Sequence, residues 1–293
     1  GSGPTTRDWL SYGFPGSDTN GSGQQLAEAL YANGVGSIRY DKAALPENTW
    51  PASETTLDLY RDEAMLAWRS LTDHPVCGRV SILGNSEGSV HAFRAGVLLQ
   101  DEPRFGGIVS LSGPSKTLLH LVKDQLKAKL PAGTDLDAVD LQLDDLDTRI
   151  RRLPEMDEPP LLSLVPEAAG VWMSLLDPIQ GELIRDLLLM EPQTFHRAYR
   201  GPALVMVADH DIQVPPSEGE AIFAALAPSE SPRYFVEITD ANHVFKYEPR
   251  VRGEVEDLVL VMAYFKDGLP LAEGLVSRIQ DFLFEQEGDQ ELP

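Results

Sequence analysis

The pentapeptide Gly84-Asn85-Ser86-Glu87-Gly88 constrains the fold of this chain more than any other stretch. Residues 79–83 before it are largely apolar and predict a buried strand, and residues 89–99 after it predict a helix. Gly-x-Ser-x-Gly between a strand and a helix is typical of a sharp, strained turn, with glycines that leave room for the packed chains. We therefore predict that Ser86 is a nucleophile exposed at the carboxyl edge of a sheet. The Glu87 amide, at the start of the helix, is expected to help bind an oxyanion.

Apolar segments and helical segments alternate on both sides of this turn, which predicts a mostly parallel sheet with helices on both faces. The expected strands are residues 35–40, 79–83, 105–112, 203–208 and 234–238. The expected helices are residues 24–33, 56–71, 89–99 and 217–226, with a helical tail over 255–285 that is broken near Gly268-Leu269-Pro270.

Residues 114–200 interrupt this alternation, because no strand pattern occurs there. Four segments read as helical instead, at residues 115–130, 136–153, 160–176 and 179–199. We therefore predict an α/β core formed by residues 1–113 and 201–293, with residues 114–200 inserted as a helical cap.

Composition excludes several classes of protein. The chain has 293 residues, and its 46 acidic against 24 basic residues give a net charge of −22, which argues against a nucleic-acid partner. No apolar run reaches the roughly 18 residues that a membrane span requires. The single cysteine, Cys77, excludes an internal disulfide framework and a cysteine-cluster metal site, and is compatible with the cytoplasmic location that we favour. We expect no metal and no organic cofactor, and nothing in the sequence indicates an oligomeric state.

A serine nucleophile needs a histidine base and a carboxylate that orients the histidine. Asp209-His210-Asp211 follows the strand expected at 203–208, and Asn242-His243 follows the strand expected at 234–238. His243 is the favoured base among six histidines because it lies in the loop after the last strand. The residues alone leave both Asp209 and Asp211 as candidates for the acid. The resulting chain order of Ser, Asp, His is that of the α/β-hydrolases.

The chain resembles the α/β-hydrolase superfamily, in the branch of bacterial serine esterases related to prolyl-oligopeptidase and dienelactone hydrolase. Four stretches carry the resemblance: Gly1-Ser2-Gly3-Pro4-Thr5 with Arg7-Asp8, Arg39-Tyr40-Asp41-Lys42, Gly84-Asn85-Ser86-Glu87-Gly88, and Asp211-Ile212-Gln213-Val214-Pro215 with Asn242-His243. The resemblance implies a triad of Ser86, Asp211 and His243. It also implies an oxyanion hole formed by the backbone amides of Glu87 and of Ser2 or Gly3.

Two departures from the family pattern accompany this resemblance. The family has a glycine-rich turn after the Arg-Tyr-Asp-Lys segment, where this chain has Ala43-Ala44-Leu45-Pro46-Glu47. The family also has a central strand leading into the Gly-Ser-Gly-Pro loop, at which this chain begins. Because a missing central strand would leave buried ladder groups unpaired, we expect upstream residues, with any signal peptide, or another segment to fill that place.

The predicted activity is hydrolysis of a small-molecule carboxylic ester, of the EC 3.1.1 class, through an acyl-enzyme. Trp172, Met173 and Leu176 of the predicted cap are candidates for an acyl pocket, although such side chains also pack a cap onto a sheet. A serine peptidase of the aminopeptidase or acyl-peptidase type would use the same triad. A non-catalytic ligand-binding protein on a hydrolase fold is the alternative from another class.

Overall fold

The protein divides into two compact units in a computed structural model. The first unit comprises Gly1–Thr49, Asp58–Ser115 and Pro192–Pro293, and the second comprises Trp50–Leu57 and Lys116–Glu191. The structure describes residues 5–10, 20–43, 45, 48, 50–128, 130–178, 180–250 and 268–285. None of the helices in these ranges is long and apolar enough to cross a membrane.

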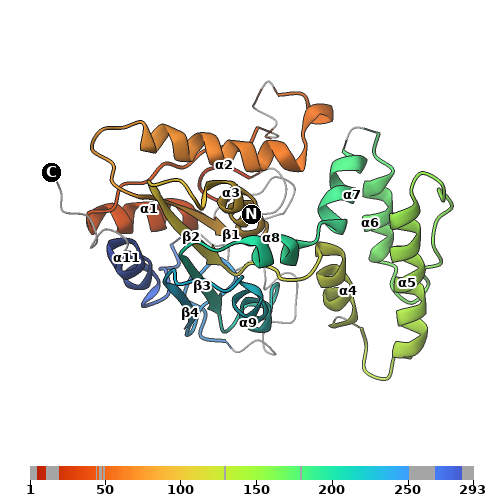
Figure 1. The fold of residues 1–293 in the computed structure, drawn as a ribbon. Coiled ribbons are helices and arrows are strands. Elements are labelled where there is room, and N and C mark those ends of the chain that lie inside the picture. Colours follow the sequence, from red (N-terminus) through yellow and green to blue (C-terminus); the bar gives the residue numbers. More distant parts are fainter. Residues whose placement is uncertain are drawn as a thin grey trace. The chain divides into compact units, whose positions relative to one another are not determined.

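The first unit is built on a parallel sheet, whose described strands run in the order β1-β2-β3-β4 (Figure 1). Every residue of β2 and β3 is buried. Burial of whole strands requires cover on both faces, which explains why these segments, apart from Ser110 of β2, carry no polar side chain and do not alternate. The strands are β1 (Val80–Asn85), β2 (Phe105–Leu111), β3 (Ala203–Ala208) and β4 (Arg233–Ile238).

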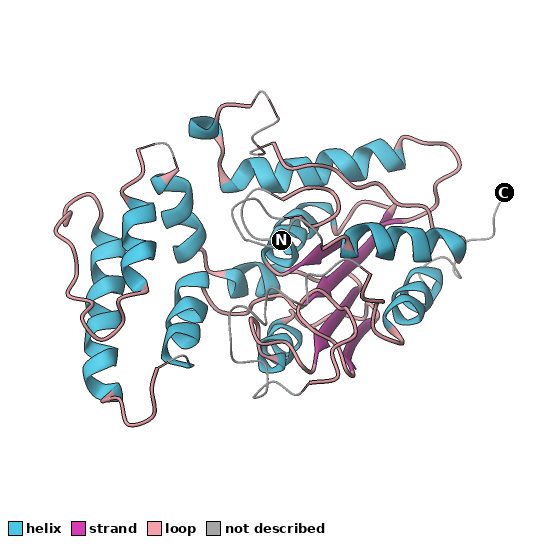
Figure 2. Ribbon diagram, turned by 180° about the vertical axis from the view of Figure 1, so that it is seen from behind, coloured by secondary structure: helices cyan, strands magenta, loops and turns pink. Residues whose placement is uncertain are grey.

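Helices cover both faces of this sheet (Figure 2). Val109 of β2 packs in one apolar cluster with residues of α1 (Ser22–Ala32) and α11 (Leu275–Glu285). Its neighbour Ile108 packs in a second cluster, which draws on the remaining helices of the unit. Those helices are α2 (Leu57–Thr72), α3 (Glu87–Leu99), α8 (Pro192–Ala198) and α9 (Pro216–Ala225). The prediction of a parallel sheet between two helical layers is thus confirmed.

The strand predicted at residues 35–40 is wrong, because these residues form no strand. Within the described part of the chain β1 pairs only with β2, and no strand lies along the other edge of β1. A strand exists only where a neighbour completes its hydrogen-bond ladder. Ile38, in the middle of this segment, is exposed.

The second unit is helical and has an apolar core of its own. Val139, Leu143, Leu146 and Ile150 recur at helical spacing on α5 and are all fully buried, so one face of α5 supplies much of this core. The helices of the unit are α4 (Leu118–Ala128), α5 (Leu136–Arg152), α6 (Ala168–Leu175) and α7 (Gly181–Leu189), preceded by the short helix η2 (Ala52–Glu54). Its role as a cap remains a prediction.

Several helix limits differ from the predicted ones. The helix expected over residues 179–199 is two helices, α7 and α8, because Pro192 begins a new helix after Leu189. The helix expected over residues 160–176 is confined to α6. In the expected tail, residues 251–267 lie outside the described residues, and α11 forms its last part after Gly268, whose φ is 85°.

Candidate functional site

The turn between β1 and α3 holds Ser86 in a strained conformation. Its φ and ψ are 56° and −125°, a backbone conformation that residues other than glycine rarely adopt. The Ser86 N–H donates to the carbonyl of Leu111, the last residue of β2, at 2.9 Å. The neighbouring strand thus holds the serine backbone in place. Such strain is common at functional sites because the surrounding fold has to maintain it.

The two glycines of the turn have different roles. A Cβ at position 84 would lie 2.1 Å from the Gly88 carbonyl oxygen, so only glycine fits there. A Cβ at position 88 would meet no atom within 4 Å. The expectation that both glycines leave room is therefore right for Gly84, whereas Gly88 contributes the backbone that approaches it.

The loops after β3 and β4 bring Asp211 and His243 into contact. His243 Nδ1 lies 2.7 Å from Asp211 Oδ2, and both side chains are buried. The other carboxylate oxygen, Oδ1, accepts from the N–H groups of Gln213 and Val214 at 2.8 and 2.9 Å. An ionised carboxylate can only accept, so His243 carries its proton on Nδ1 and keeps a lone pair on Nε2. A histidine held in this tautomer is suited to act as a general base.

Asp209, the second candidate acid, has another partner. Its Oδ1 accepts from the Ala241 N–H at 3.1 Å, which joins the loop after β3 to the loop after β4. The carboxylate that contacts His243 Nδ1 is therefore that of Asp211.

Asn85 and Asn242 hold the histidine loop in place. Asn242 Oδ1 accepts from the N–H groups of Val244 and Lys246, both at 3.1 Å, and so closes the turn around His243. Asn85 Nδ2 donates to the His243 carbonyl at 3.1 Å and to the Leu111 carbonyl at 3.3 Å. This side chain joins the strand that carries Ser86 to the loop that carries His243. Sequence reasoning missed Asn85, although a buried amide at a strand end has to find acceptors.

The three residues of the predicted triad follow three strands of one parallel sheet. Ser86 follows β1, Asp211 follows β3 and His243 follows β4. Because the carboxyl ends of parallel strands share one edge, all three lie at that edge, where open α/β sheets bind their ligands. Asp211 and His243 are in direct contact, and Asn85 connects His243 to the serine turn.

Glu87, whose amide is predicted to bind an oxyanion, begins α3 and is buried. Its Oε1 lies 3.1 Å from Lys42 Nζ and 3.2 Å from His91 Nε2. Burial on its own would raise the pKa of Glu87, but the Lys42 ammonium and the His91 hydrogen bond outweigh it and hold the pKa below its ordinary value. Glu87 is therefore an anion at neutral pH. Ser2 and Gly3, the other candidates for the oxyanion hole, lie outside the described residues.

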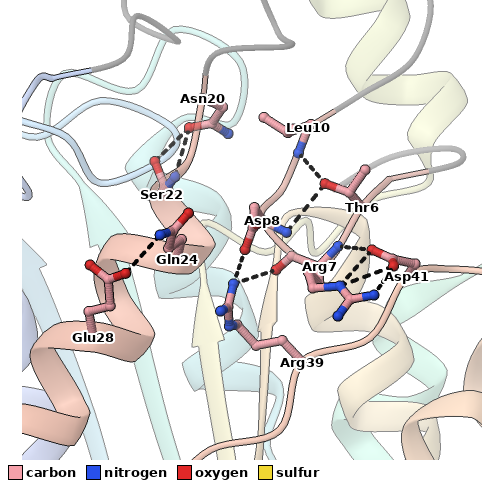
Figure 3. Close-up of polar contacts among 10 residues, drawn as sticks. All are labelled: Thr6, Arg7, Asp8, Leu10, Asn20, Ser22, Gln24, Glu28, Arg39 and Asp41. Atoms are coloured by element: carbon pink, nitrogen blue, oxygen red, sulfur yellow. Dashed lines mark hydrogen bonds and ion pairs between the residues drawn. The ribbon is translucent and has the colours of Figure 1, made fainter.

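Two of the stretches that carry the family resemblance meet in the fold (Figure 3). Asp41 accepts from the Arg7 N–H at 2.8 Å and from Arg7 Nε at 3.0 Å. Arg39 forms an ion pair with Asp8, and the Lys42 N–H donates to the Thr5 carbonyl at 3.2 Å. These contacts join the N-terminal stretch to residues 39–42.

The three candidate pocket residues lie on or beside α6 in the helical unit. Trp172 is buried in the core of that unit, as the packing alternative expects. Met173 and Leu176 are 65% and 45% exposed and stay candidates for a pocket. A groove elsewhere, between α1 and the start of α11, is lined by Gln25, Leu271 and Gln280 among others, and by none of the triad residues. Within the described ranges no three His, Cys, Asp or Glu side chains are grouped so that they could hold a metal ion.

Comparisons with known proteins gave matches only among solved structures. No protein-family model and no curated protein matches the chain. Est1E from Butyrivibrio proteoclasticus with bound ferulic acid matches at a TM-score of 0.52 and 15% identity, over 91% of this chain and 83% of Est1E. A structure from work on the metagenome-derived lipolytic enzymes LipS and LipT matches at 0.52 and 15%, over 91% and 89%. VinJ matches at 0.52 and 16%, over 92% and 86%.

Proposed function

We propose that this chain, which has the α/β-hydrolase fold, is a serine hydrolase that cleaves carboxylic esters. The observation that carries the proposal is the buried Asp211–His243 pair at the sheet edge where the strained Ser86 turn also lies. A fold alone does not determine chemistry, so the argument depends on these side chains. Two structural neighbours, Est1E with ferulic acid and the LipS and LipT structure, have names that point to esters and lipids, which agrees with the proposal.

In the proposed reaction, His243 Nε2 takes the proton from Ser86 as the serine oxygen attacks the ester carbonyl. The tetrahedral intermediate then places its oxyanion against the Glu87 amide, and the alcohol leaves with the proton from His243. Water, deprotonated by the same histidine, cleaves the acyl-enzyme. Asp211 stabilises the imidazolium that forms twice in this cycle.

The proposed second oxyanion donor is an amide of Ser2 or Gly3. The contacts of Arg7 and Asp8 with Asp41 and Arg39 support this assignment, because they attach the residues that follow this loop to the segment containing Lys42. Lys42 in turn contacts Glu87, the first donor.

The test is turnover of a p-nitrophenyl ester by the whole chain and by Ser86→Ala. We expect wild-type hydrolysis, stoichiometric labelling by a fluorophosphonate, and loss of both in the variant while its far-UV circular dichroism is unchanged. Turnover retained in Ser86→Ala, or a wild type that is neither labelled nor active on esters of graded acyl length, would refute the proposal. Faster release from an aminoacyl arylamide than from an ester would point to a peptidase instead.

A further inference from the structure

A buried cluster of charged and polar side chains lies beside the serine turn, and the reaction above gives it no task. Glu87 is its centre, with Lys42 and His91 on the same oxygen, Oε1. The side chains of Lys42, Glu87 and His91 are only 11%, 3% and 5% exposed. Charges are costly to bury, so a cluster at this depth calls for an explanation.

The protonation states of the cluster follow from its donors. Arg94 Nη1 lies 3.3 Å from His91 Nδ1. A guanidinium can only donate, so Nδ1 accepts. The ring proton therefore sits on Nε2 and is donated to Glu87 Oε1 at 3.2 Å. Burial lowers the pKa of His91, which agrees with a neutral ring. Among Lys42, Glu87 and His91 there is thus one cation, one anion and one neutral ring, and the Arg94 guanidinium lies beside the histidine.

Lys42 is itself held from three directions. Its Nζ lies 4.4 Å from the centre of the Tyr60 ring on α2, a cation–π contact. The backbone on either side is also fixed, since the Lys42 N–H donates to Thr5 and the Ala43 N–H donates to Glu63 Oε1 at 2.6 Å. Its ammonium is therefore a fixed point for the Glu87 carboxylate rather than a mobile surface charge.

Stability alone does not account for this pair, because buried ion pairs can often be replaced by apolar side chains without loss. Two requirements of the proposed reaction do account for it. The Glu87 N–H has to keep a fixed position next to Ser86, whose backbone is strained, with φ at 56°. The Glu87 carboxylate, next in sequence to the nucleophile, would also repel a developing oxyanion unless a cation neutralised it.

We propose that Lys42 and His91 are positioning residues, which hold the Glu87 side chain so that its backbone amide is fixed for the oxyanion and its negative charge is neutralised. This inference rests on the proposed ester hydrolysis. The Arg39-Tyr40-Asp41-Lys42 segment thereby acquires a function: it attaches to the N-terminal stretch through Arg39 and Asp41 and to the serine turn through Lys42.

The test is a double-mutant cycle of Lys42→Met, Glu87→Gln and the combined variant. Lys42→Met leaves a buried carboxylate without its cation, so its melting temperature should fall sharply. The combined variant removes both charges, so its melting temperature should return close to that of the wild type. Its kcat should nonetheless stay about ten- to a hundredfold low with KM little changed, because part of one oxyanion-hole contact is lost.

Binding of a transition-state analogue distinguishes an effect on the oxyanion site from an effect on stability alone. Affinity for an aryl trifluoromethyl ketone should fall by about the same factor as kcat/KM across the cycle, because both measure binding of the oxyanion. Tyr199→Phe is the matched control, since it removes the hydrogen bond of 2.7 Å that the buried Tyr199 donates to the Pro202 carbonyl in the first unit. It should lower the melting temperature and leave kcat unchanged.

The outcomes distinguish this inference from the proposed function. A combined variant that regains wild-type kcat and analogue affinity, or a Tyr199→Phe variant that loses as much kcat as the cycle variants, would overturn the positioning role alone. A wild type without ester turnover and without fluorophosphonate labelling would overturn both.

Discussion

His196 should make the protein sensitive to mild acid. This residue of α8 is fully buried and packs edge-on against Phe93 with ring centres 4.6 Å apart. Among the residues that the structure describes, neither of its ring nitrogens has a hydrogen-bond partner. Burial, with a smaller effect of Arg197, lowers the pKa of His196 to about 3. The histidine is therefore neutral in the folded protein at every pH at which the protein is normally handled.

The loss in the free energy of unfolding follows from the difference between the pKa values of His196 in the folded and unfolded chain. An unfolded histidine titrates near about 6.5, so as the pH falls the unfolded chain binds this proton first. The stability that the neutral ring contributes is present above about pH 6.5 and is lost progressively as the pH falls toward the folded pKa of about 3. Between pH 7.5 and pH 5 the loss from this one group is about 2 kcal/mol, at about 1.4 kcal/mol for each pH unit below 6.5.

The variant His196→Leu removes the titration and keeps a side chain of similar volume. Urea unfolding followed by tryptophan fluorescence at pH 7.5, 6 and 5 should show that the variant loses about 2 kcal/mol less than the wild type over this range. His91, whose pKa burial also lowers, is present in both proteins and does not affect the difference. The exposed His74 serves as control, because His74→Gln removes a histidine without emptying a buried site. Parallel stability curves for wild type and His196→Leu would refute the reasoning.

Two further predictions concern the candidate site. Asp211→Asn should lower kcat for an aryl ester by about a thousandfold or more, because an amide can donate to His243 Nδ1 and so favour the wrong tautomer; Asp209→Asn, which can still accept from Ala241, should keep most of the activity, and equal losses in the two would contradict the assignment. Asn85→Ala should lower stability by about 1–3 kcal/mol, because the buried His243 carbonyl loses its Asn85 donor, whereas the Leu111 carbonyl still accepts from the Ser86 N–H; it should also lower kcat several-fold by loosening the histidine loop. A lower melting temperature with unchanged kcat would show that Asn85 acts on the fold alone.

The strands β1 to β4 could be predicted from the sequence because each is a short apolar run bounded by turn residues. The same pattern predicted that Asp211 and His243, in the loops after β3 and β4, lie at one edge of the sheet, since loops at the carboxyl ends of parallel strands meet there. The strand predictions depend only on residues within each strand and its turns. The placement of the two loops depends only on the strands being parallel.

Residues 35–40 show where this kind of reasoning fails. Their apolar and β-branched residues favour a strand, but ladder formation depends on a neighbour that no pattern within the segment reveals. The contacts of Asn85, Lys42 and His91 were missed for a related reason, because they join residues that only the folded sheet brings together.

The Gly-x-Ser-x-Gly turn contains both positions that the motif itself explains and positions whose contacts only the folded structure shows. Gly84 is required by a steric clash that any such turn would have, so the motif itself predicts it. The two variable positions carry contacts that belong to this chain: Asn85 binds the histidine loop, and Glu87 binds Lys42 and His91. In the proposed reaction, Asn85 holds the loop of the general base and the contacts of Glu87 hold the oxyanion donor, neither of which the motif alone determines. Transplanting Gly84-Asn85-Ser86-Glu87-Gly88 without Lys42 and the His243 loop should then transfer the strained turn but little catalysis.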